Sequence, residues 1–282
     1  MKFLISNDDG VYAPGLLALY RALSKIGEVV VVAPNAEHSG SASSLHISQP
    51  LYAQKLASGF ISVNGSPADC VYLALNQLYC ETRFDCVITG INAGDNLGQN
   101  VHYSGTFGAA LTAQVFGVPA IATSLVGGTM SDDEQQRSRY DLAAAEIVKL
   151  LTETSILDVI GQLPEHVLNV NIPPITCAKD IKGRKVTSIG YRQIEQPVHH
   201  IVDPRGREAY WLSLRKRQPL SSETEPFQPL TPESATDCDD AAGHTVVYTD
   251  YQAVTAGYIS LSPIRLSHTP TTTLNTFLNT TL

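Results

Sequence analysis

Residues 29–33, four valines followed by an alanine, form the apolar run that most limits what this chain can fold into. β-branched side chains favour extended backbone, and a strand without polar alternation is expected to be buried on both faces. Such strands are typical of parallel sheets that carry helices on each side. The run therefore favours a strand inside a parallel sheet.

Further strands and helices alternate around this run. Strands are predicted at residues 3–6, 84–89, 118–124 and 169–172. Helices are predicted from Pro14, which suits a first helical turn, from Ser66 and Pro67, over residues 106–116, and from the acidic start at 131–134. This β-α-β-α order predicts an α/β fold with a doubly wound, mostly parallel sheet.

The second half of the chain changes character. Residues 191–214 alternate enough to predict a hairpin that extends from the body, and residues 216–243 predict a long polar loop. Strands at 246–248 and 258–262 and a weak helix at 271–282 follow. We expect a single domain with a core over residues 1–175 and a β-rich extension with a C-terminal segment over 176–282. Because an isolated hairpin is marginal in water, the extension is expected to bind a partner subunit, giving a homodimer or homotetramer.

Composition excludes several classes of protein. With 282 residues and 43% apolar residues the chain suits a soluble globular protein, and its formal net charge of −8 argues against binding to nucleic acid. No apolar run approaches the roughly 20 residues of a membrane span, and the first apolar run is too short for a signal peptide. Five cysteines without a C-x-x-C pair indicate reduced thiols in the cytoplasm.

Asp8 and Asp9 follow the first predicted strand directly. Two adjacent carboxylates repel each other, and the repulsion is strongest where little water screens it. A divalent cation removes that repulsion, and oxygen ligands suit Mg²⁺, Mn²⁺ or Ca²⁺ better than zinc. The alternative is an Asx-type turn in which Gly10 supplies a positive φ.

Two other polar turns follow predicted strands. Residues 34–45, with Ser39-Gly40-Ser41 at their centre, follow the second strand, and residues 90–98 follow the strand at 84–89. Ligands gather at the carboxyl ends of strands in an open α/β sheet, so these turns and the paired aspartates should share one edge. Two carboxylates, a hydroxyl and amide oxygens there would leave positions on a cation for water and substrate.

The 90–98 turn leads into Tyr103-Ser104-Gly105-Thr106 at a predicted helix start. Glycines let backbone approach a ligand, and free N–H groups at a helix start bind anions, so a phosphoryl group is the expected guest. The alternative is a flexible loop followed by a Ser/Thr cap. The turn is neither a Walker A loop nor a dinucleotide fingerprint.

Taken together, these motifs resemble the SurE family of 5′/3′-nucleotidases. The resemblance rests on Ser-Asn-Asp-Asp-Gly-Val-Tyr-Ala-Pro-Gly at 6–15, Val-Ala-Pro at 32–34 with Ser39-Gly40, Gly-Ser-Pro-Ala-Asp-Cys-Val at 65–71, the 90–98 turn and Tyr-Ser-Gly-Thr at 103–106. It is densest over residues 1–125 and returns at 203–206, 210–211, 249–250 and 257–260.

The resemblance implies a Rossmann-like core, a hairpin and exchanged C-terminal segment used for oligomer contacts, and a metal-dependent phosphomonoesterase acting on nucleoside 5′-monophosphates. Nucleoside 3′-monophosphates and short polyphosphate are further candidate substrates. It implies one Mg²⁺ or Mn²⁺ per subunit on Asp8, Asp9, Ser39 and Asn92, and phosphate contacts from Asn96, Ser104, Gly105 and Thr106. Asp8 or Asp9 would orient or deprotonate the attacking water.

Two other functions are weighed against this one. A phosphatase with a phospho-aspartyl intermediate usually carries Asp-x-Asp-x-Thr/Val after its first strand, and Asn7-Asp8-Asp9-Gly10 does not match that pattern. A metal-dependent nucleotide-binding regulatory protein without turnover would need the same ligands. His38, His46 and His102 lie near the expected edge and are weaker candidates for a direct role, because a loop histidine is more often a surface residue.

Overall fold

One sheet of ten strands runs through the part of the chain that this computed structural model describes, which is residues 1–195, 197–214 and 248–266. The strand order is β11-β8-β12-β7-β6-β5-β1-β2-β4-β3. The bounds are β1 (Lys2–Ser6), β2 (Glu28–Pro34), β3 (Ala53–Lys55), β4 (Ile61–Val63), β5 (Cys86–Ala93), β6 (Ala120–Leu125), β7 (His166–Ile172), β8 (Arg184–Ser188), β11 (Tyr248–Thr249) and β12 (Ile259–Arg265).

The pairing is parallel from β2 through β1, β5 and β6 to β7. Antiparallel pairing occurs between β7 and β12 and between β3 and β4. β12 then pairs in parallel with β8 on its other side. The sheet therefore crosses the expected core boundary at residue 175, because β8, β11 and β12 extend the sheet beyond β7.

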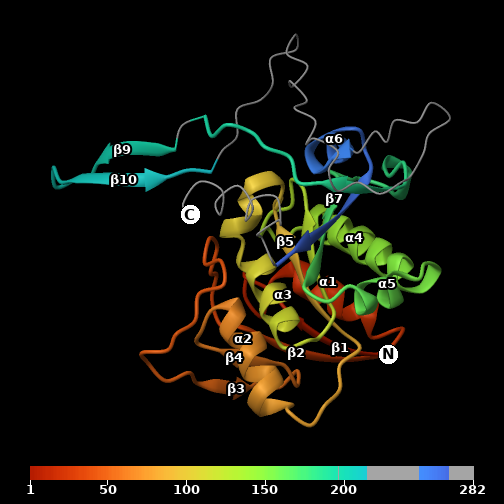
Figure 1. The fold of residues 1–282 in the computed structure, drawn as a ribbon. Coiled ribbons are helices and arrows are strands. Elements are labelled where there is room, and N and C mark those ends of the chain that lie inside the picture. The colour runs from red at the N-terminus through yellow and green to blue at the C-terminus, as the bar shows by residue number, and fades with distance from the viewer. Residues whose placement is uncertain (196, 215–247, 267–282) are drawn as a thin grey trace, which may run out of the picture.

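Helices cover both faces of the sheet (Figure 1). Their bounds are α1 (Pro14–Leu23), α2 (Pro67–Leu73), α3 (Gly105–Val115), α4 (Glu134–Glu153), α5 (Ile156–Gln162) and α6 (Asp250–Thr255). A π-helical turn at Ala74–Leu78 and 3₁₀ turns at Gly98–Tyr103 and Ala178–Asp180 complete them. α1 packs against α4, and α2 packs against α3. The predicted doubly wound, mostly parallel α/β fold is confirmed.

Strand β1 shows why the sheet separates two cores. Phe3 and Ile5 belong to the cluster that α1 and α4 cover, whereas Leu4 belongs to the cluster that α2 and α3 cover. Successive strand residues point to opposite faces, so a wholly apolar strand supplies both cores at once.

The predicted hairpin is present as β9 (Val198–Val202) and β10 (Glu208–Leu212), an antiparallel pair that forms its own two-stranded sheet. Figure 1 shows it projecting from the body of the molecule. The predicted loop at 216–243 and the predicted helix at 271–282 lie outside the described residues, as do the first two residues of the strand expected at 246–248.

The segment after α2 does not bury all the side chains that the sequence predicts to face the core. In the sequence, the spacing of Val71, Leu75 and Leu78 predicts that all three face inward, but in the structure Leu78 is exposed while Val71 is buried. The helix widens to a π-helical turn at Ala74–Leu78, and the wider turn rotates the following side chains away from the helical repeat.

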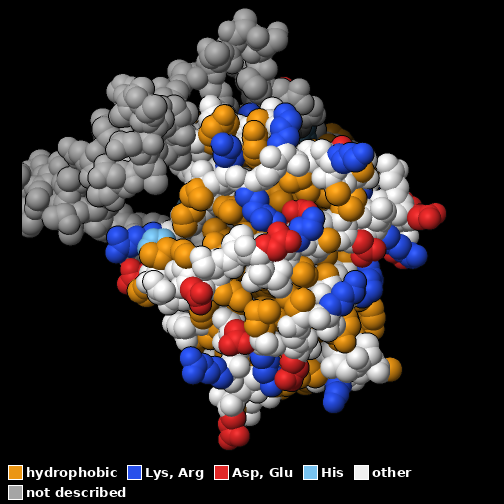
Figure 2. All heavy atoms as spheres, turned by 90° about the vertical axis from the view of Figure 1, so that its right-hand side faces the viewer, with side chains coloured by type: hydrophobic (Ala, Val, Ile, Leu, Met, Phe, Trp, Pro, Cys, Tyr) orange, Lys and Arg blue, Asp and Glu red, His pale blue; other side chains and the backbone are white. Residues whose placement is uncertain are grey.

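The molecular surface carries charges of both signs. Figure 2 shows Lys and Arg side chains interspersed with Asp and Glu side chains on one face of the molecule. Among the described residues, no helix combines the length and the apolar character needed to cross a membrane.

Candidate active site

The turn after β1 carries the paired aspartates at the carboxyl edge of the sheet. Asn7 Nδ2 donates to the Gly10 carbonyl at 2.9 Å, and Gly10 has a φ of +102°. The turn that we weighed as an alternative therefore exists, but Asn7 makes it. Asp8 and Asp9 use their side chains elsewhere, so they are more than local turn residues.

The two carboxylates are buried, with exposed fractions of 4% for Asp8 and 8% for Asp9. Thr106 Oγ1 donates to Asp8 Oδ1, and the Ala93 amide donates to Asp9 Oδ2 at 2.9 Å. Burial raises the pKa of Asp8, although hydrogen bonds from Thr106 oppose the rise. Burial and then the neighbouring Asp8 charge raise the pKa of Asp9 to about 7.

A third carboxylate, Glu37, lies close enough to raise the pKa of both aspartates further. No cationic side chain is among the groups that set the pKa of either aspartate. Glu37 and the two aspartates therefore concentrate negative charge at this edge of the sheet.

Helix α3 begins directly beside Asp8. Ser104 caps it, with Oγ accepting from the Phe107 amide at 3.0 Å. A Cβ on Gly105 would lie 2.6 Å from Ser41 Oγ and 2.9 Å from Asp8 Cβ, so only glycine lets the helix start come this close. The positive end of α3 therefore points at the acidic pair.

Asn92 and Asn96 come from the turn after β5. Asn92 Oδ1 lies 3.4 Å from Thr106 Oγ1, next to Asp8, while its Nδ2 donates to the Gly94 carbonyl at 3.2 Å. Asn96 is buried, and its Nδ2 donates to Ser124 Oγ at 2.9 Å. Asn92 thus reaches the acidic pair through Thr106, whereas the side chain of Asn96 is engaged with β6.

Two asparagines of β7 support Asn96, and sequence reasoning did not select them. Asn171 Oδ1 accepts from the Asn96 amide at 2.9 Å, and the Asn96 carbonyl accepts from Asn169 and Asn171 at 2.9 and 3.1 Å. The sequence feature that could have identified Asn169 and Asn171 is a polar residue at every second position of an otherwise apolar strand. Such polar residues are unusual in a strand buried on both faces.

The side chain of Ser39, a predicted metal ligand, does not contact the acidic pair in the structure. It is exposed, and its hydroxyl donates to Glu37 Oε1 at 2.8 Å instead of contacting the acidic pair. The loop that carries it is nevertheless held at the site, because the His38 amide donates to the Asp8 carbonyl at 2.7 Å. Ser41 on the same loop was not selected, yet its Oγ is buried beside Gly105 without a hydrogen-bond partner.

The three loop histidines do not converge on the pair. His46 Nδ1 lies 2.6 Å from Asp69 Oδ2, at the start of α2. The His38 contact with Asp8 is through its backbone, and His102 is exposed beside a cavity of about 150 Å³ that Ser104 and Phe107 also line.

The donor set fits a hard divalent cation. Two buried carboxylates, the Asn92 amide oxygen and two buried oxygens without hydrogen-bond partners, Asn7 Oδ1 and Ser41 Oγ, belong to this edge. All are oxygen atoms, the ligand type that Mg²⁺ and Mn²⁺ prefer. Among the described residues, no group of three His, Cys, Asp or Glu side chains is arranged to hold a metal.

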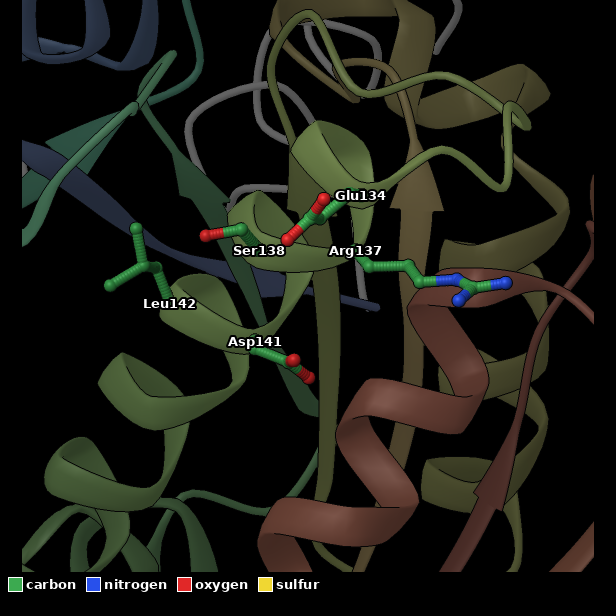
Figure 3. A pocket seen from close by; sticks show the side chains of 5 residues that line it. All are labelled: Glu134, Arg137, Ser138, Asp141 and Leu142. Carbon is green, nitrogen blue, oxygen red and sulfur yellow. The ribbon is translucent and has the colours of Figure 1, made fainter.

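A larger surface hollow, of about 390 Å³, lies on α4. Figure 3 shows its lining side chains, Glu134, Arg137, Ser138, Asp141 and Leu142, pointing in different directions from one helix. None of the predicted site residues lines it, so the hollow is separate from the acidic pair.

Fold and site together define a Rossmann-like α/β protein with an acidic, oxygen-rich centre and a helix start at one carboxyl edge. The chain belongs to the SurE family, because the family model described as Survival protein SurE matches residues 3–196. The resemblance seen in the motifs is thereby confirmed.

Relatives match along almost the whole chain. A protein of Psychrobacter cryohalolentis named 5′-nucleotidase SurE is 63% identical over 276 residues, which cover 98% of this chain and 97% of the relative. A protein of Acinetobacter baylyi with the same name is 39% identical and covers 95% of each chain. The crystal structure of the SurE protein from Aquifex aeolicus superposes with a TM-score of 0.75 at 33% identity, covering 99% of this chain and 100% of that one.

Proposed function

We infer that the chain is a 5′-nucleotidase, a phosphomonoesterase that releases phosphate from nucleoside 5′-monophosphates. Relatives at 63% and 39% identity carry this name over nearly their full length. The observation that supports the inference is the juxtaposition of the buried Asp8 and Asp9 carboxylates with the start of α3. An acidic pair beside an anion-binding helix start suits a phosphate ester held next to a dication.

In this proposal Asp8, Asp9, Ser39 and Asn92 hold one Mg²⁺ or Mn²⁺. Such a cation supplies Lewis acidity toward a phosphoryl oxygen and lowers the pKa of water. Asp8 and Asn92 already share Thr106 as a neighbour, which supports their part in the set. For Ser39 to take part, its hydroxyl would leave Glu37 and turn toward the pair.

The phosphate side of the site follows from α3. The N–H groups of Gly105 and Thr106 would bind the phosphoryl oxygens, because a helix start is positive and its amides lack partners within the helix. Ser104 would act mainly by capping α3, since its Oγ already accepts from Phe107. Asn96 would approach the phosphate from the turn after β5, and Asp8 or Asp9 would orient or deprotonate the attacking water.

Phosphate release tests the proposal. Wild-type protein is incubated with AMP and GMP in the presence of Mn²⁺ or Mg²⁺, and in a parallel arm with EDTA. We expect release with metal, none after chelation, and recovery when Mn²⁺ is added back. Nucleoside 3′-monophosphates and short polyphosphate serve as further substrates.

Other outcomes point to the other functions. Nucleotide binding without release in the presence of metal would favour a regulatory binding protein. Release that survives exhaustive chelation would contradict the metal-centred reaction. A covalent aspartyl adduct with a phosphate analogue would favour the phospho-aspartyl mechanism.

We propose further that the protein works in the cytoplasm as a homodimer or homotetramer. The four cysteines within the described residues are all free, which suits a reducing compartment. The exposed apolar side chains of the β9–β10 hairpin support subunit contact.

A further inference from the structure

Asp250, the first residue of α6, is completely buried between two segments that are far apart in the sequence. Its Oδ2 accepts from the Gly98 amide at 2.6 Å, and its Oδ1 accepts from the Gly190 amide at 2.9 Å and the Tyr251 amide at 2.8 Å. Hydrogen bonds to an ionised carboxylate are stronger than those between neutral groups. One side chain thus joins three backbone segments.

Two of these segments belong to functional regions. Gly98 lies in residues 94–99, which we call the Asn96 turn. Gly190 stands where the chain leaves β8 for the hairpin, and we call residues 190–192 the hairpin root. Figure 1 shows α6 lying over the body of the sheet, on the side from which the hairpin extends. Asp250 therefore connects the proposed phosphate side of the site with the extension.

Further contacts surround the Asp250 carboxylate. The Gln99 side chain donates to the Arg192 carbonyl and accepts from the Arg192 amide at 3.3 Å. Tyr251 Oη donates to the Leu97 carbonyl at 3.1 Å, and the Arg192 guanidinium stacks 4.2 Å from the centre of the Tyr251 ring. The Asn96 turn and the hairpin root are thus paired directly as well as through α6.

The packing leaves no room for a side chain at Gly98 or Gly190. A Cβ on Gly98 would lie 2.5 Å from Tyr251 Cε2 and 2.7 Å from the Gly190 carbonyl oxygen. A Cβ on Gly190 would lie 2.7 Å from Tyr251 Cδ2. The backbones of Gly98 and Gly190 therefore lie close against the Tyr251 ring, so a displacement of the hairpin root is expected to disturb the turn too.

The other end of the Asn96 turn is equally fixed. Asn171 accepts from the Asn96 amide, and Asn169 and Asn171 donate to its carbonyl. Only Leu97 separates Asn96 from Gly98. The short span that carries Asn96 is therefore held between β7 on one side and Asp250 on the other.

We propose that Asp250 is a positioning residue that holds the Asn96 turn in place for phosphate binding and couples it to the hairpin root. The proposal rests on the proposed function, because it takes Asn96 as a phosphate contact. Asp250 itself touches neither phosphate nor metal. Its effect on the reaction passes through the backbone of Gly98.

The test is Asp250→Asn in the full-length protein. An asparagine replaces one accepting oxygen by an NH₂ group, which cannot accept from the Gly98 or Gly190 amide. The KM for AMP and the inhibition constant of inorganic phosphate should both rise by about tenfold, as expected for loss of a charge-assisted hydrogen bond. The Mn²⁺ concentration for half-maximal activity should stay unchanged, because the proposed metal ligands are untouched.

Asp180→Asn is the matched control. Asp180 Oδ2 also accepts backbone amides, from Thr176 at 2.6 Å and Cys177 at 2.8 Å, but it is exposed and has no contact with the Asn96 turn. It should leave KM and phosphate inhibition at wild-type values. A purely structural role for Asp250 would lower the active fraction, and therefore kcat, without changing KM.

Tyr251→Phe covers the case in which Asp250→Asn does not fold. It removes the hydrogen bond to the Leu97 carbonyl and should raise KM and the phosphate inhibition constant by about twofold to threefold. If Asp250→Asn folds and both constants keep their wild-type values, the proposal is overturned. If only Tyr251→Phe folds, wild-type values of both constants in that variant overturn it.

Hydrogen exchange provides a readout that does not depend on catalysis. In wild-type protein with Mn²⁺, inorganic phosphate should slow exchange of the Gly98 and Gly190 amides together. In Asp250→Asn, protection of the hairpin root should be lost while phosphate still protects the start of α3. Equal protection of the root in both proteins would refute the coupling. A wild-type protein that releases no phosphate from any nucleotide would instead refute the proposed function, and this measurement would still decide the role of Asp250.

Discussion

Asp8 and Asp9 are adjacent in the chain but are held by different parts of the fold. Asp8 accepts a hydrogen bond from Thr106 at the start of α3, and Asp9 accepts one from the Ala93 amide at the end of β5. Both accept hydrogen bonds there, and no cationic side chain is among the groups that set their pKa values. In the proposed metal site, the two members of a pair held in this way should contribute separately to cation binding.

Asp9→Asn should weaken metal binding and lower phosphate release by on the order of a hundredfold or more, because one of two anionic ligands becomes neutral. The measurement is kcat/KM for AMP over a series of Mn²⁺ concentrations. Asp85→Asn is the control, since Asp85 is an exposed carboxylate that accepts only from the Lys2 amide at 2.7 Å. Near-native turnover of Asp9→Asn at low metal concentration would make Asp9 a turn residue only.

Gly105→Ala should lower phosphate release by at least about tenfold while the protein stays folded. The new methyl group would meet Ser41 Oγ at 2.6 Å and Asp8 Cβ at 2.9 Å, so the helix start would move away from the acidic pair, and small displacements of this kind reduce rates strongly. Gly161→Ala is the control, because a Cβ there meets no atom within 4 Å. Equal activity of the two variants would show that the close approach of α3 has no catalytic value.

At the scale of elements, α2 holds the loop that carries Ser39. The predicted start at Ser66 and Pro67 is correct, and Ser66 and Asp69 form a capping box. The same residues reach beyond the helix. Ser66 Oγ donates to the Ser44 carbonyl at 2.6 Å, and Asp69 accepts from the His46 amide at 2.9 Å and faces the His46 ring.

Asp69→Asn should lower the free energy of unfolding by about 1–3 kcal/mol at pH 7, because a buried acceptor of several hydrogen bonds is replaced. Burial alone would raise the pKa of Asp69, but hydrogen bonds from His46 and Ser66 hold it below its ordinary value. A lowered folded-state pKa stabilises the protein above the unfolded pKa, near 4, and this stability is lost as the pH falls through the folded pKa. The difference between wild type and variant should therefore shrink below about pH 4.

Urea unfolding at pH 7 and at stepped pH values below 4 measures this difference. The exposed Asp158, in the first turn of α5, provides the control Asp158→Asn, which should match wild type closely. A difference between wild type and Asp69→Asn that stays constant as the pH falls would contradict the assigned role of the Asp69 charge.

The sequence predicted the elements that depend on local pattern. Apolar runs located β1, β2, β5, β6 and most of β7, and the polar residues after three of these strands located the site edge. This succeeds because a strand buried on both faces must be apolar throughout, while its carboxyl end must be polar to bind ligands. The acidic start of α4 was predicted for the same local reason, since Asp133 caps it.

Other features depend on contacts between distant residues and left no local signal. The contacts of Asn96 with β7 span more than 70 residues, and those of Asp250 with Gly98 span 152. The hydrogen bond from Ser39 to Glu37 competes with the expected role of Ser39 as a metal ligand. The sequence alone does not decide whether the Ser39 hydroxyl binds the Glu37 carboxylate or a cation. The metal and phosphate ligand sets as a whole remain predictions.

At the scale of the whole molecule, the hairpin exposes more apolar side chains than a strand packed on the body would, within the residues that the structure describes. Tyr210, Trp211 and Leu212 are 65%, 69% and 77% exposed on β10, and β9 adds Val198, Ile201 and Val202. Because a two-stranded hairpin with exposed apolar side chains is marginal in water, a second subunit is the expected cover.

Light scattering should therefore find a dimer, or a dimer paired into a tetramer, at micromolar concentration. Trp211→Glu should shift this equilibrium toward smaller species, because it places a charge on the proposed contact surface. Glu153→Gln, on the exposed end of α4, is the control. A single wild-type species of 30.4 kDa would contradict the assembly.

The position of β12 has a consequence for how the protein is made. β12 lies between β7 and β8, although it follows both in the chain. During synthesis at roughly 5–20 residues per second, β7 leaves the ribosome many seconds before its partner exists. Its edge stays open through that interval, and open edges invite pairing with other chains. The yield of folded protein in the cell should therefore depend strongly on chaperones that shield the open edge of a nascent sheet. The stability of the folded enzyme alone would not predict this dependence.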